Sequence, residues 1–292
     1  MKYPIALALV LAVSAPVWAG DAAPAATSAV AEQAGQSRFI LLEGGRNFRD
    51  VGGYRTADGH SVKPGVMYRS GSLGSLAPQG QATFSALKVA SIIDLRTTEE
   101  RSHDTTDFLT TSAPGYWARD YGMSRGDMAK AFSSSGRPTA ESMKAMMTQA
   151  YRTLPKEQAP SYRVMFARLV EGKQPLVVNC TAGKDRTGIA TALVLTALGV
   201  PYETVKQDFL LSNNAPGMDT LAGALPGPLA KLPPEVLKPL AGVDGEYLDT
   251  AFSQLRQDYG SVESYMEKEL GVGPDEVATL RRNMLTPEGT AQ

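Results

Sequence analysis

Residues 177–190 read VVNCTAGKDRTGIA and contain Cys180, the only cysteine among the 292 residues of the chain. The short apolar run over 175–179 predicts a buried strand, and residues 187–198 predict a helix that ends at Gly199. Between them lies a six-residue loop, which can turn its backbone N–H groups toward the positive end of the helix dipole and so favour a bound anion. Strand, loop and helix in this order predict an anion site.

The side chains of this loop indicate which anion it binds and which reaction it supports. Arg186 follows Cys180 after five intervening residues, and its planar guanidinium suits two phosphate oxygens at once. Cys180 at the base of the loop lies in the same positive field, which favours a nucleophilic thiolate. A nucleotide-binding P-loop is excluded because Val178 and Asp185 stand where that motif requires glycine and a hydroxyl residue.

The composition excludes some classes of partner. The chain carries 29 basic and 30 acidic residues, so no overall field attracts nucleic acid or an anionic membrane. A lone cysteine with only His60 and His103 argues against a structural zinc site. We expect no metal and no other cofactor. The sequence assigns no oligomeric state.

The N-terminus has the pattern of an export signal. Lys2 precedes an apolar stretch over 5–13 that is too short to span a bilayer, and Ala19 ends a small-x-small cleavage site. We expect a signal peptide over 1–19, a flexible linker over 20–36, and a periplasmic or secreted protein without stable membrane insertion. An uncleaved N-terminal anchor is the alternative. In an oxidising compartment a single cysteine closes no intramolecular disulfide, so Cys180 is either a small buried hydrophobe or a working thiol.

The rest of the chain, 37–287, is expected to form one domain. Its pattern predicts a strand near 66–69, a helix over 78–88 and a strand within 90–96. Two further helices are expected within 139–154 and 161–172, the first with a stripe of methionines that is more typical of core than of a binding face. A Pro- and Gly-rich segment over about 215–245 suits a lid, and 246–285 suits two or three amphipathic helices.

Several segments resemble one family in order along the chain. They are similar to segments of the atypical bacterial tyrosine/serine protein phosphatases, a branch of the cysteine-dependent tyrosine phosphatases. The segments are NFRDVGGY, VMYRSG, IIDLRTTEE, CTAGKDRTG, YLDTAF and YGSVESYMEKELGV. The resemblance covers about 46–282. Together with the alternating pattern, it implies an α/β fold with a mainly parallel sheet of four or five strands, helices on both faces and a helical lid.

The resemblance also implies roles for residues of the loop. Cys180 would attack phosphorus to form a thiophosphate, Arg186 would stabilise the transition state, and the Thr187 hydroxyl would assist breakdown of the intermediate. Lys184 would add positive charge for an acidic substrate. The backbone of the loop, beginning with Thr181, Ala182 and Gly183, would bind the phosphate oxygens. Arg49, in a Gly-rich stretch that matches the family, is expected among the substrate-binding residues. Its sequence position allows two interpretations, ordering of the floor of the site or a surface turn.

The general acid is not determined by the resemblance, because the Trp-Pro-Asp segment of common tyrosine phosphatases is absent from the sequence. Asp185 and Asp94 are the leading candidates, and Asp120 is the third. Each has a structural alternative: Asp185 orients an arginine, Asp94 pairs with Arg96, and Asp120 is a solvated loop residue.

One departure from the family and several functions remain open. Asn179 stands where most tyrosine phosphatases have histidine before the cysteine, and asparagine donates a similar hydrogen bond without a charge. The expected function is hydrolysis of phosphotyrosine, with phosphoserine and phosphothreonine as further substrates. Alternatives are a phosphoinositide or inositol phosphate phosphatase and an inactive phosphate-binding protein. A rhodanese-like sulfurtransferase is disfavoured because its loop lacks the Gly-Lys-Asp-Arg-Thr-Gly run.

Overall fold

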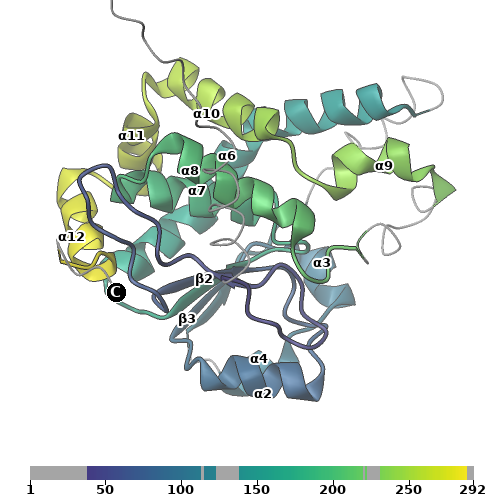
Figure 1. Ribbon diagram of the computed structural model, residues 1–292, viewed down its shortest axis with the longest axis horizontal. Helices are drawn as coiled ribbons and strands as arrows, with labels where there is room; N and C mark the ends of the chain where they lie inside the picture. The colour runs from purple at the N-terminus through teal and green to yellow at the C-terminus, as the bar shows by residue number, and fades with distance from the viewer. Residues whose placement is uncertain (1–37, 113–114, 123–137, 220, 222–230, 288–292) are drawn as a thin grey trace, which may run out of the picture.

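The computed structural model describes residues 38–112, 115–122, 138–219, 221 and 231–287 (Figure 1). Its centre is a five-stranded sheet with the order β1-β2-β5-β3-β4. The strands are β1 (Arg49–Asp50), β2 (Met67–Ser70), β3 (Ser91–Asp94), β4 (Tyr116–Ala118) and β5 (Leu176–Asn179). β2, β5, β3 and β4 are parallel, and β1 is antiparallel at one edge. The predicted α/β class with a mainly parallel sheet is confirmed.

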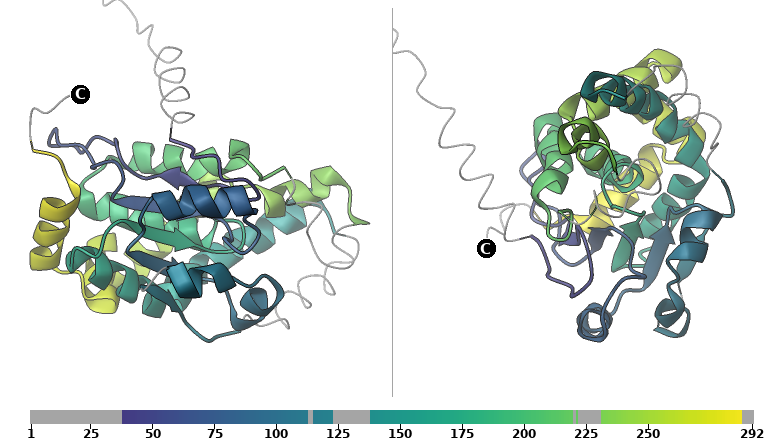
Figure 2. Two further views of the ribbon diagram at one scale, coloured as in Figure 1. Left: turned by 90° about the horizontal axis from the view of Figure 1, so that it is seen from below. Right: turned by 90° about the vertical axis from the view of Figure 1, so that its right-hand side faces the viewer.

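Helices cover both faces of the sheet. The short helices α2 (Pro78–Ala86) and α4 (Asp107–Ser112) lie on one face, and α6 (Ala140–Val170) and α7 (Arg186–Leu198) lie on the other (Figures 1 and 2). Neighbouring residues of β5 serve both layers: Val177 packs in the cluster of α2, whereas Val178 packs with α6 and α7. This alternation follows from the pleat, which points successive side chains to opposite faces.

Helix α6 differs from the prediction of two separate helices. It runs unbroken over Ala140–Val170 although it contains Pro155 and Pro160. Proline lacks an N–H donor and usually bends or ends a helix. Here burial of its inner face outweighs that preference, and the Tyr265 hydroxyl donates to the carbonyl of Pro155 at 2.6 Å. Met143 and Met147 are buried on this helix, as a core stripe requires.

Helix α7 carries the predicted loop at its N-terminal end. It begins at Arg186, one residue earlier than expected, and ends at Leu198. Gly199 follows as the C-cap, with a φ of 88° in the left-handed conformation that glycine favours. Nearly every side chain of α7 is buried, so the helix is a fixed support for the loop. The following helix α8 (Tyr202–Leu210) and the short turn η1 (Leu211–Asn214) were not anticipated from the sequence.

The C-terminal region forms α10 (Gly245–Tyr259), α11 (Val262–Tyr265), the π-helical turn η4 (Met266–Leu270) and α12 (Pro274–Met284). Within the predicted lid, the structure describes 215–219, 221 and 231–245, including helix α9 (Pro234–Ala241) beside α6. Ala215, Met218 and Leu221 pack against Ala182, so the start of this segment contacts the loop.

The N-terminal expectations concern residues that the structure does not describe. The predicted signal peptide and linker, 1–36, lie outside the described residues. Among the helices of the described ranges, none has the length and apolar character needed to span a bilayer.

Candidate active site

Cys180 follows directly on the last residue of the central strand β5 and is 1 % exposed. It is a free thiol at the base of the loop that leads into α7. The strand is buried and hydrogen-bonded on both sides, which fixes the place of the sulfur at the C-terminal edge of the sheet. Parallel sheets of this kind bind ligands at that edge.

The loop after Cys180 has its carbonyl groups turned outward. The carbonyl of Thr181 accepts from the backbone N–H of Ser72 at 3.0 Å. The carbonyls of Ala182 and Gly183 accept from the side-chain amide of Asn47 at 3.2 and 3.0 Å. Within the described residues, none of the backbone N–H groups from 181 to 185 donates to another group. They remain available to the oxygens of a bound anion, beside the N-terminus of α7.

Arg186 is held over the loop by Glu100, which lies in helix α3 (Thr98–His103). Its Nη1 donates to Glu100 Oε2 at 2.7 Å, and its Nη2 donates to Glu100 Oε1 at 2.7 Å. Nη1 also reaches the carbonyl of Leu95 at 3.0 Å. The Nε–H donates to no residue of the described part of the chain and is left for a bound anion. A bidentate pair of this kind fixes the plane of the guanidinium.

The charge of Glu100 is maintained by the same contacts. Burial raises the pKa of Glu100, but hydrogen bonds and charge from Arg186, with further bonds from Thr181 and Thr97, outweigh burial and bring it to about 2. Burial likewise opposes the charge of Arg186, yet its pKa lies well above the usual value because hydrogen bonds to Glu100 and the charge of Glu100 favour the cation. Both partners are therefore ionised at neutral pH.

A second network supports the loop from beneath, with Asp208 of α8 at its centre. Asp208 accepts from Arg49 Nε at 3.1 Å, Arg69 Nη1 at 2.5 Å and the Tyr54 hydroxyl at 2.9 Å. Burial raises the pKa of Asp208, but the two arginines outweigh burial and hold it well below the usual range. Burial and the neighbouring Arg49 lower the pKa of Arg69 to about 10, so it stays charged at neutral pH.

This network reaches the loop through two donors. Arg69 Nη2 donates to the carbonyl of Gly183 at 2.9 Å, beside the bond from Asn47. Arg49 donates in turn to the side-chain oxygen of Asn47, whose φ of 56° is a left-handed conformation that asparagine tolerates better than most residues. The network thus fixes the peptide of Gly183.

The expectation that Arg49 binds substrate directly is corrected by this arrangement. Arg49 has no exposed surface, and its guanidinium is occupied by Asp208 and Asn47. It orders the floor of the site, which was one of the two interpretations of its sequence position.

Lys184, Asp185 and Tyr151 form a contact at the end of the loop. The Lys184 ammonium donates to Asp185 Oδ1 at 2.8 Å, and the Tyr151 hydroxyl donates to the same oxygen at 2.6 Å. The side chain of Lys184 is 4 % exposed and that of Asp185 is 25 % exposed. Of the three carboxylates considered as general acids, Asp185 therefore combines membership of the loop with access to solvent.

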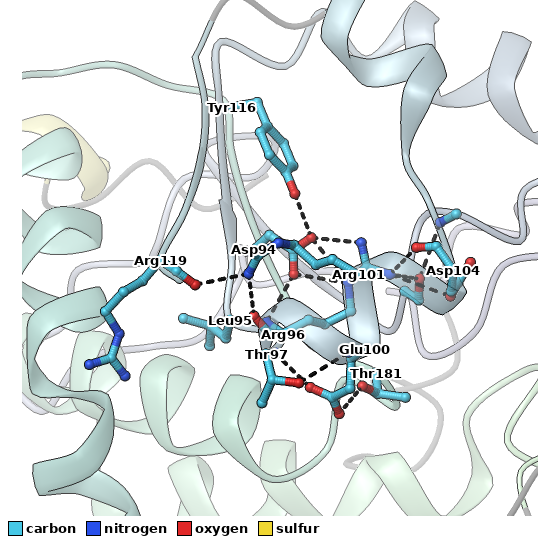
Figure 3. A network of polar contacts seen from close by, with 12 residues as sticks. Asp94, Leu95, Arg96, Thr97, Glu100, Arg101, Asp104, Tyr116, Arg119 and Thr181 are labelled. Atoms are coloured by element: carbon cyan, nitrogen blue, oxygen red, sulfur yellow. Dashed lines mark hydrogen bonds and ion pairs between the residues drawn. The ribbon is translucent and has the colours of Figure 1, made fainter. Parts of the chain in front are cut away.

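Asp94 lies in a different environment. Its carboxylate receives the Arg96 Nε and Nη2 groups at 3.0 and 2.7 Å, together with the Tyr116 hydroxyl at 2.9 Å. Figure 3 shows Tyr116 and Arg96 around this carboxylate, separate from the contact between Glu100 and Thr181. With 1 % exposure, Asp94 matches its structural alternative, an ion pair with Arg96.

The remaining candidates occupy distinct positions. Asp120 pairs with Arg101 at 2.6 Å, and its side chain is 87 % exposed, which matches a solvated loop residue. Thr187 is fully buried in the first turn of α7, and its hydroxyl has no partner in the described ranges. The side chain of Asn179 is also buried, and neither its oxygen nor its nitrogen bonds to a described residue. The hydrogen bond expected from Asn179 is therefore not seen.

The sequence did not reveal which residues surround the loop. Glu100, Arg69 and Asn47 stand in segments that carried the family resemblance, but nothing in those segments assigned their partners. Glu100 does have a local signal, since Thr97 and Glu100 have the spacing of a helix capping box and form one. No comparable local signal marks Asp208 or Tyr151 as a partner of the loop.

Two cavities lie away from this site. They have volumes of about 390 and 250 Å³ and share Thr196 near the C-terminal end of α7, whereas the loop is at the other end of that helix. In the part of the chain that the structure describes, no three acidic, cysteine or histidine side chains are grouped as metal ligands.

Several known proteins are similar in sequence to this chain. The profile of the tyrosine phosphatase family matches residues 40–286. A protein of Cupriavidus necator, provisionally named tyrosine-protein phosphatase, is 32 % identical over 82 % of this chain and 85 % of its own length. The triple specificity protein phosphatase PtpB of Mycobacterium tuberculosis is 28 % identical over 84 % of this chain and 98 % of its own length. A tyrosine-protein phosphatase of Nostoc commune is 28 % identical over 76 % of this chain and 74 % of its own length.

Proposed function

This chain belongs to the tyrosine phosphatase family and is a phosphoric monoester hydrolase, and on that basis we propose phosphotyrosine as its primary substrate and Cys180 as the residue that takes up the phosphoryl group. One observation carries the proposal. Arg186, held by the two 2.7 Å hydrogen bonds that it donates to Glu100, lies beside a loop whose N–H groups from 181 to 185 donate to no described residue and can bind an anion.

In the first step the Cys180 thiolate attacks phosphorus while the phosphorus–oxygen bond to the leaving group breaks. Asp185 donates its proton to the departing oxygen and becomes a carboxylate. The loop N–H groups and Arg186 bind the three remaining phosphoryl oxygens, where charge is held in the transition state. The products of this step are the free alcohol or phenol and a thiophosphate on Cys180.

In the second step water attacks the phosphorus of the thiophosphate. The Asp185 carboxylate takes one proton from that water, the phosphorus–sulfur bond breaks, and Cys180 leaves as a thiolate. The Thr187 hydroxyl, which is buried and without a partner in the described ranges, is suited to donate a hydrogen bond to the departing sulfur. Inorganic phosphate is released and both residues return to their starting states.

The assignment of the acid to Asp185 is supported by exposure and position. Asp185 belongs to the loop and is partly exposed, whereas the Asp94 carboxylate is buried against Arg96 and Tyr116. Asp120 is exposed but pairs with Arg101 outside the loop. A proton donor has to reach the leaving oxygen, so access favours Asp185.

The substrate range is proposed to include phosphoserine and phosphothreonine. The Mycobacterium tuberculosis relative is named a triple specificity protein phosphatase, and it shares most of its length with this chain. The Lys184 ammonium adds positive charge beside the loop without selecting one ester. Phosphoinositides and inositol phosphates are the alternative substrates for the same chemistry.

Steady-state kinetics on a panel of substrates tests the proposal. Phosphotyrosine, phosphoserine and phosphothreonine peptides, inositol phosphates and phosphoinositides are compared by kcat/KM. We expect phosphotyrosine peptides to give the highest value, vanadate to inhibit, and Cys180→Ser to abolish both turnover and the covalent intermediate. Binding of phosphopeptides without turnover by the unmodified chain would instead identify an inactive phosphate-binding protein.

We further propose export of the protein to the periplasm or the medium. The observation behind this proposal is the arrangement of Lys2, the apolar stretch over 5–13 and the cleavage site ending at Ala19. Mass spectrometry of the mature protein from a periplasmic extract is expected to find Gly20 as its first residue. Retention of Met1 in a membrane fraction would support an uncleaved anchor instead.

A further inference from the structure

The two oxygens of the Asp185 carboxylate are not equivalent. Oδ1 accepts from both the Tyr151 hydroxyl at 2.6 Å and the Lys184 ammonium at 2.8 Å. No described residue donates to Oδ2. Although Asp185 is the N-cap residue of α7, its side chain makes no capping bond to that helix. An aspartate in this position commonly caps, so the side chain here is turned to other contacts.

Tyr151 is held firmly in place to make this contact. It lies on α6 with no exposed surface, and its ring packs edge-on against Phe209 of α8 with centroids 6.1 Å apart. On another side it meets Tyr247 of α10 at 5.1 Å. Three helices therefore fix the direction of the Tyr151 hydroxyl toward the loop, and buried aromatic rings in such contacts have little freedom.

The hydroxyl of Tyr151 also keeps its proton. Burial, followed by the charge of Asp185, raises the pKa of Tyr151 well above its usual value. The other titratable groups around Tyr151 and Asp185 are Lys184 on the loop, Cys180 at its base and Tyr247 on α10. Burial raises the pKa of Tyr247 to about 12. Both tyrosines are thus neutral donors over the working pH range, and Lys184 supplies the charge nearby.

We propose that Tyr151 is a positioning residue for proton transfer, because together with Lys184 it occupies Oδ1 of Asp185 and so leaves Oδ2 to carry the proton to the leaving group. A protonated carboxyl has a single O–H donor, and an oxygen that already accepts two hydrogen bonds is the poorer place for it. After the proton has moved, the same two donors stabilise the new carboxylate. The inference rests on the proposed role of Asp185 as the general acid.

The test compares pH profiles of kcat/KM for two substrates in Tyr151→Phe. The phenol of phenyl phosphate is a poor leaving group that has to be protonated as it departs. The p-nitrophenol of p-nitrophenyl phosphate is a good leaving group that departs without a proton. We expect kcat/KM for phenyl phosphate to fall about 10- to 100-fold and for p-nitrophenyl phosphate to fall less than threefold, as loss of one hydrogen bond to a charged group predicts. The basic limb of the profile should move up by about one pH unit, because the carboxylate loses a donor.

Tyr202→Phe is the matched control. Its hydroxyl donates to Asp249 at 2.8 Å between α8 and α10, outside the site, so this variant removes a similar bond without touching the loop. It should leave kcat/KM for both substrates and the pH of the basic limb unchanged. Rates are referred to the fraction of enzyme that gives a first-turnover burst, which removes any loss of folded protein from the comparison.

A second replacement keeps the test decisive if Tyr151→Phe folds poorly. Incorporation of 3-fluorotyrosine at position 151 preserves the ring and makes its hydroxyl a stronger donor. We expect the basic limb to move to lower pH, opposite to Tyr151→Phe. A limb unmoved by either replacement overturns the role of Tyr151.

Asp185→Asn separates this inference from the proposed function. If Asp185→Asn removes the basic limb and Tyr151→Phe leaves it in place, Asp185 is the acid but Tyr151 does not position it. If Asp185→Asn retains the limb, the assignment of the acid itself fails, and the inference fails with it. Support requires that Tyr151→Phe have no further effect on the leaving-group dependence when combined with Asp185→Asn.

Discussion

Glu100 and Arg186 meet in two parallel hydrogen bonds of 2.7 Å, although 86 positions separate them in the sequence. Glu100 is delivered by the short helix α3, directly after strand β3, and Arg186 by the first turn of α7, directly after the loop that follows β5. Because β3 and β5 are adjacent parallel strands, both side chains arise at the same edge of the sheet. The ion pair therefore fixes the orientation of the Arg186 guanidinium before a substrate binds.

Replacing Glu100 by glutamine is expected to lower kcat/KM for p-nitrophenyl phosphate about 10- to 100-fold, since hydrogen bonds to charged groups contribute roughly 1.5–3 kcal/mol. The reason is that Arg186 loses the charge that holds its plane. Steady-state kinetics checks this result. Glu99→Gln is the control, because Glu99 is an exposed neighbour in the same helix turn, and it should change kcat/KM less than twofold. Equal losses in the two variants would contradict the role of the pair.

The same pair predicts a change in acid stability. The pKa of Glu100 in the folded protein, about 2, lies below its ordinary value of 4.5, so its stabilisation is complete above about pH 4.5 and is lost as the pH falls toward 2. Glu100→Gln should therefore flatten the fall of unfolding free energy between these pH values. Urea titrations at pH 5.5, 4.0 and 3.0 measure the slope. Slopes that remain parallel in the two proteins would contradict the expectation.

Asp208→Asn is expected to destabilise the fold by about 3–5 kcal/mol, as removal of one partner from a buried ion pair does. The change leaves Arg49 and Arg69 buried without their anion. Urea unfolding provides the measurement. Asp249→Asn, which removes a surface pair with Lys206 and a bond from Tyr202, is the control and should cost about 1 kcal/mol or less. Similar losses from both replacements would show that Asp208 is not the centre of the network.

Gly183→Ala is expected to lower kcat/KM at least 100-fold. Gly183 has a φ of 70°, and a methyl group there would lie 2.4 Å from backbone atoms of Ser70 and Gly71, so the loop has to move. Kinetics with p-nitrophenyl phosphate measures the loss.

The control for this replacement is Gly59→Ala. Gly59 has a φ of 90°, but no atom lies within 4 Å of the added methyl group. It should cost about 1 kcal/mol in stability and leave kcat/KM unchanged, because only backbone strain is added. Full activity in Gly183→Ala would show that the close approach does not fix the loop.

Much of the fold could be predicted from the sequence because strands and helices follow from local patterns of apolar residues, glycine and proline. Several elements lie close to where the sequence predicts them. They are the strands near 66–69, 90–96 and 175–179, the helix over 78–88 and the loop beginning at Cys180. The division of α6 into two helices was wrong, since the preference of proline for a break was outweighed by burial of a continuous inner face. Local preference yields to packing where a helix spans the whole core.

The sequence by itself determined the loop that carries Cys180: the order of strand, Cys180, five residues and Arg186 is local, and the expected anion site follows from backbone geometry. Only the tertiary structure decided which distant side chains act on that loop. Glu100 and Tyr151 contact it from two helices, and Asp208 supports it through Arg69. Arg49 and Asp94 are instead held in buried ion pairs. The physical reason is that the strength of a hydrogen bond and the pKa of a charged group depend on the partners and the burial of that group. Both are determined by how elements distant in sequence pack together.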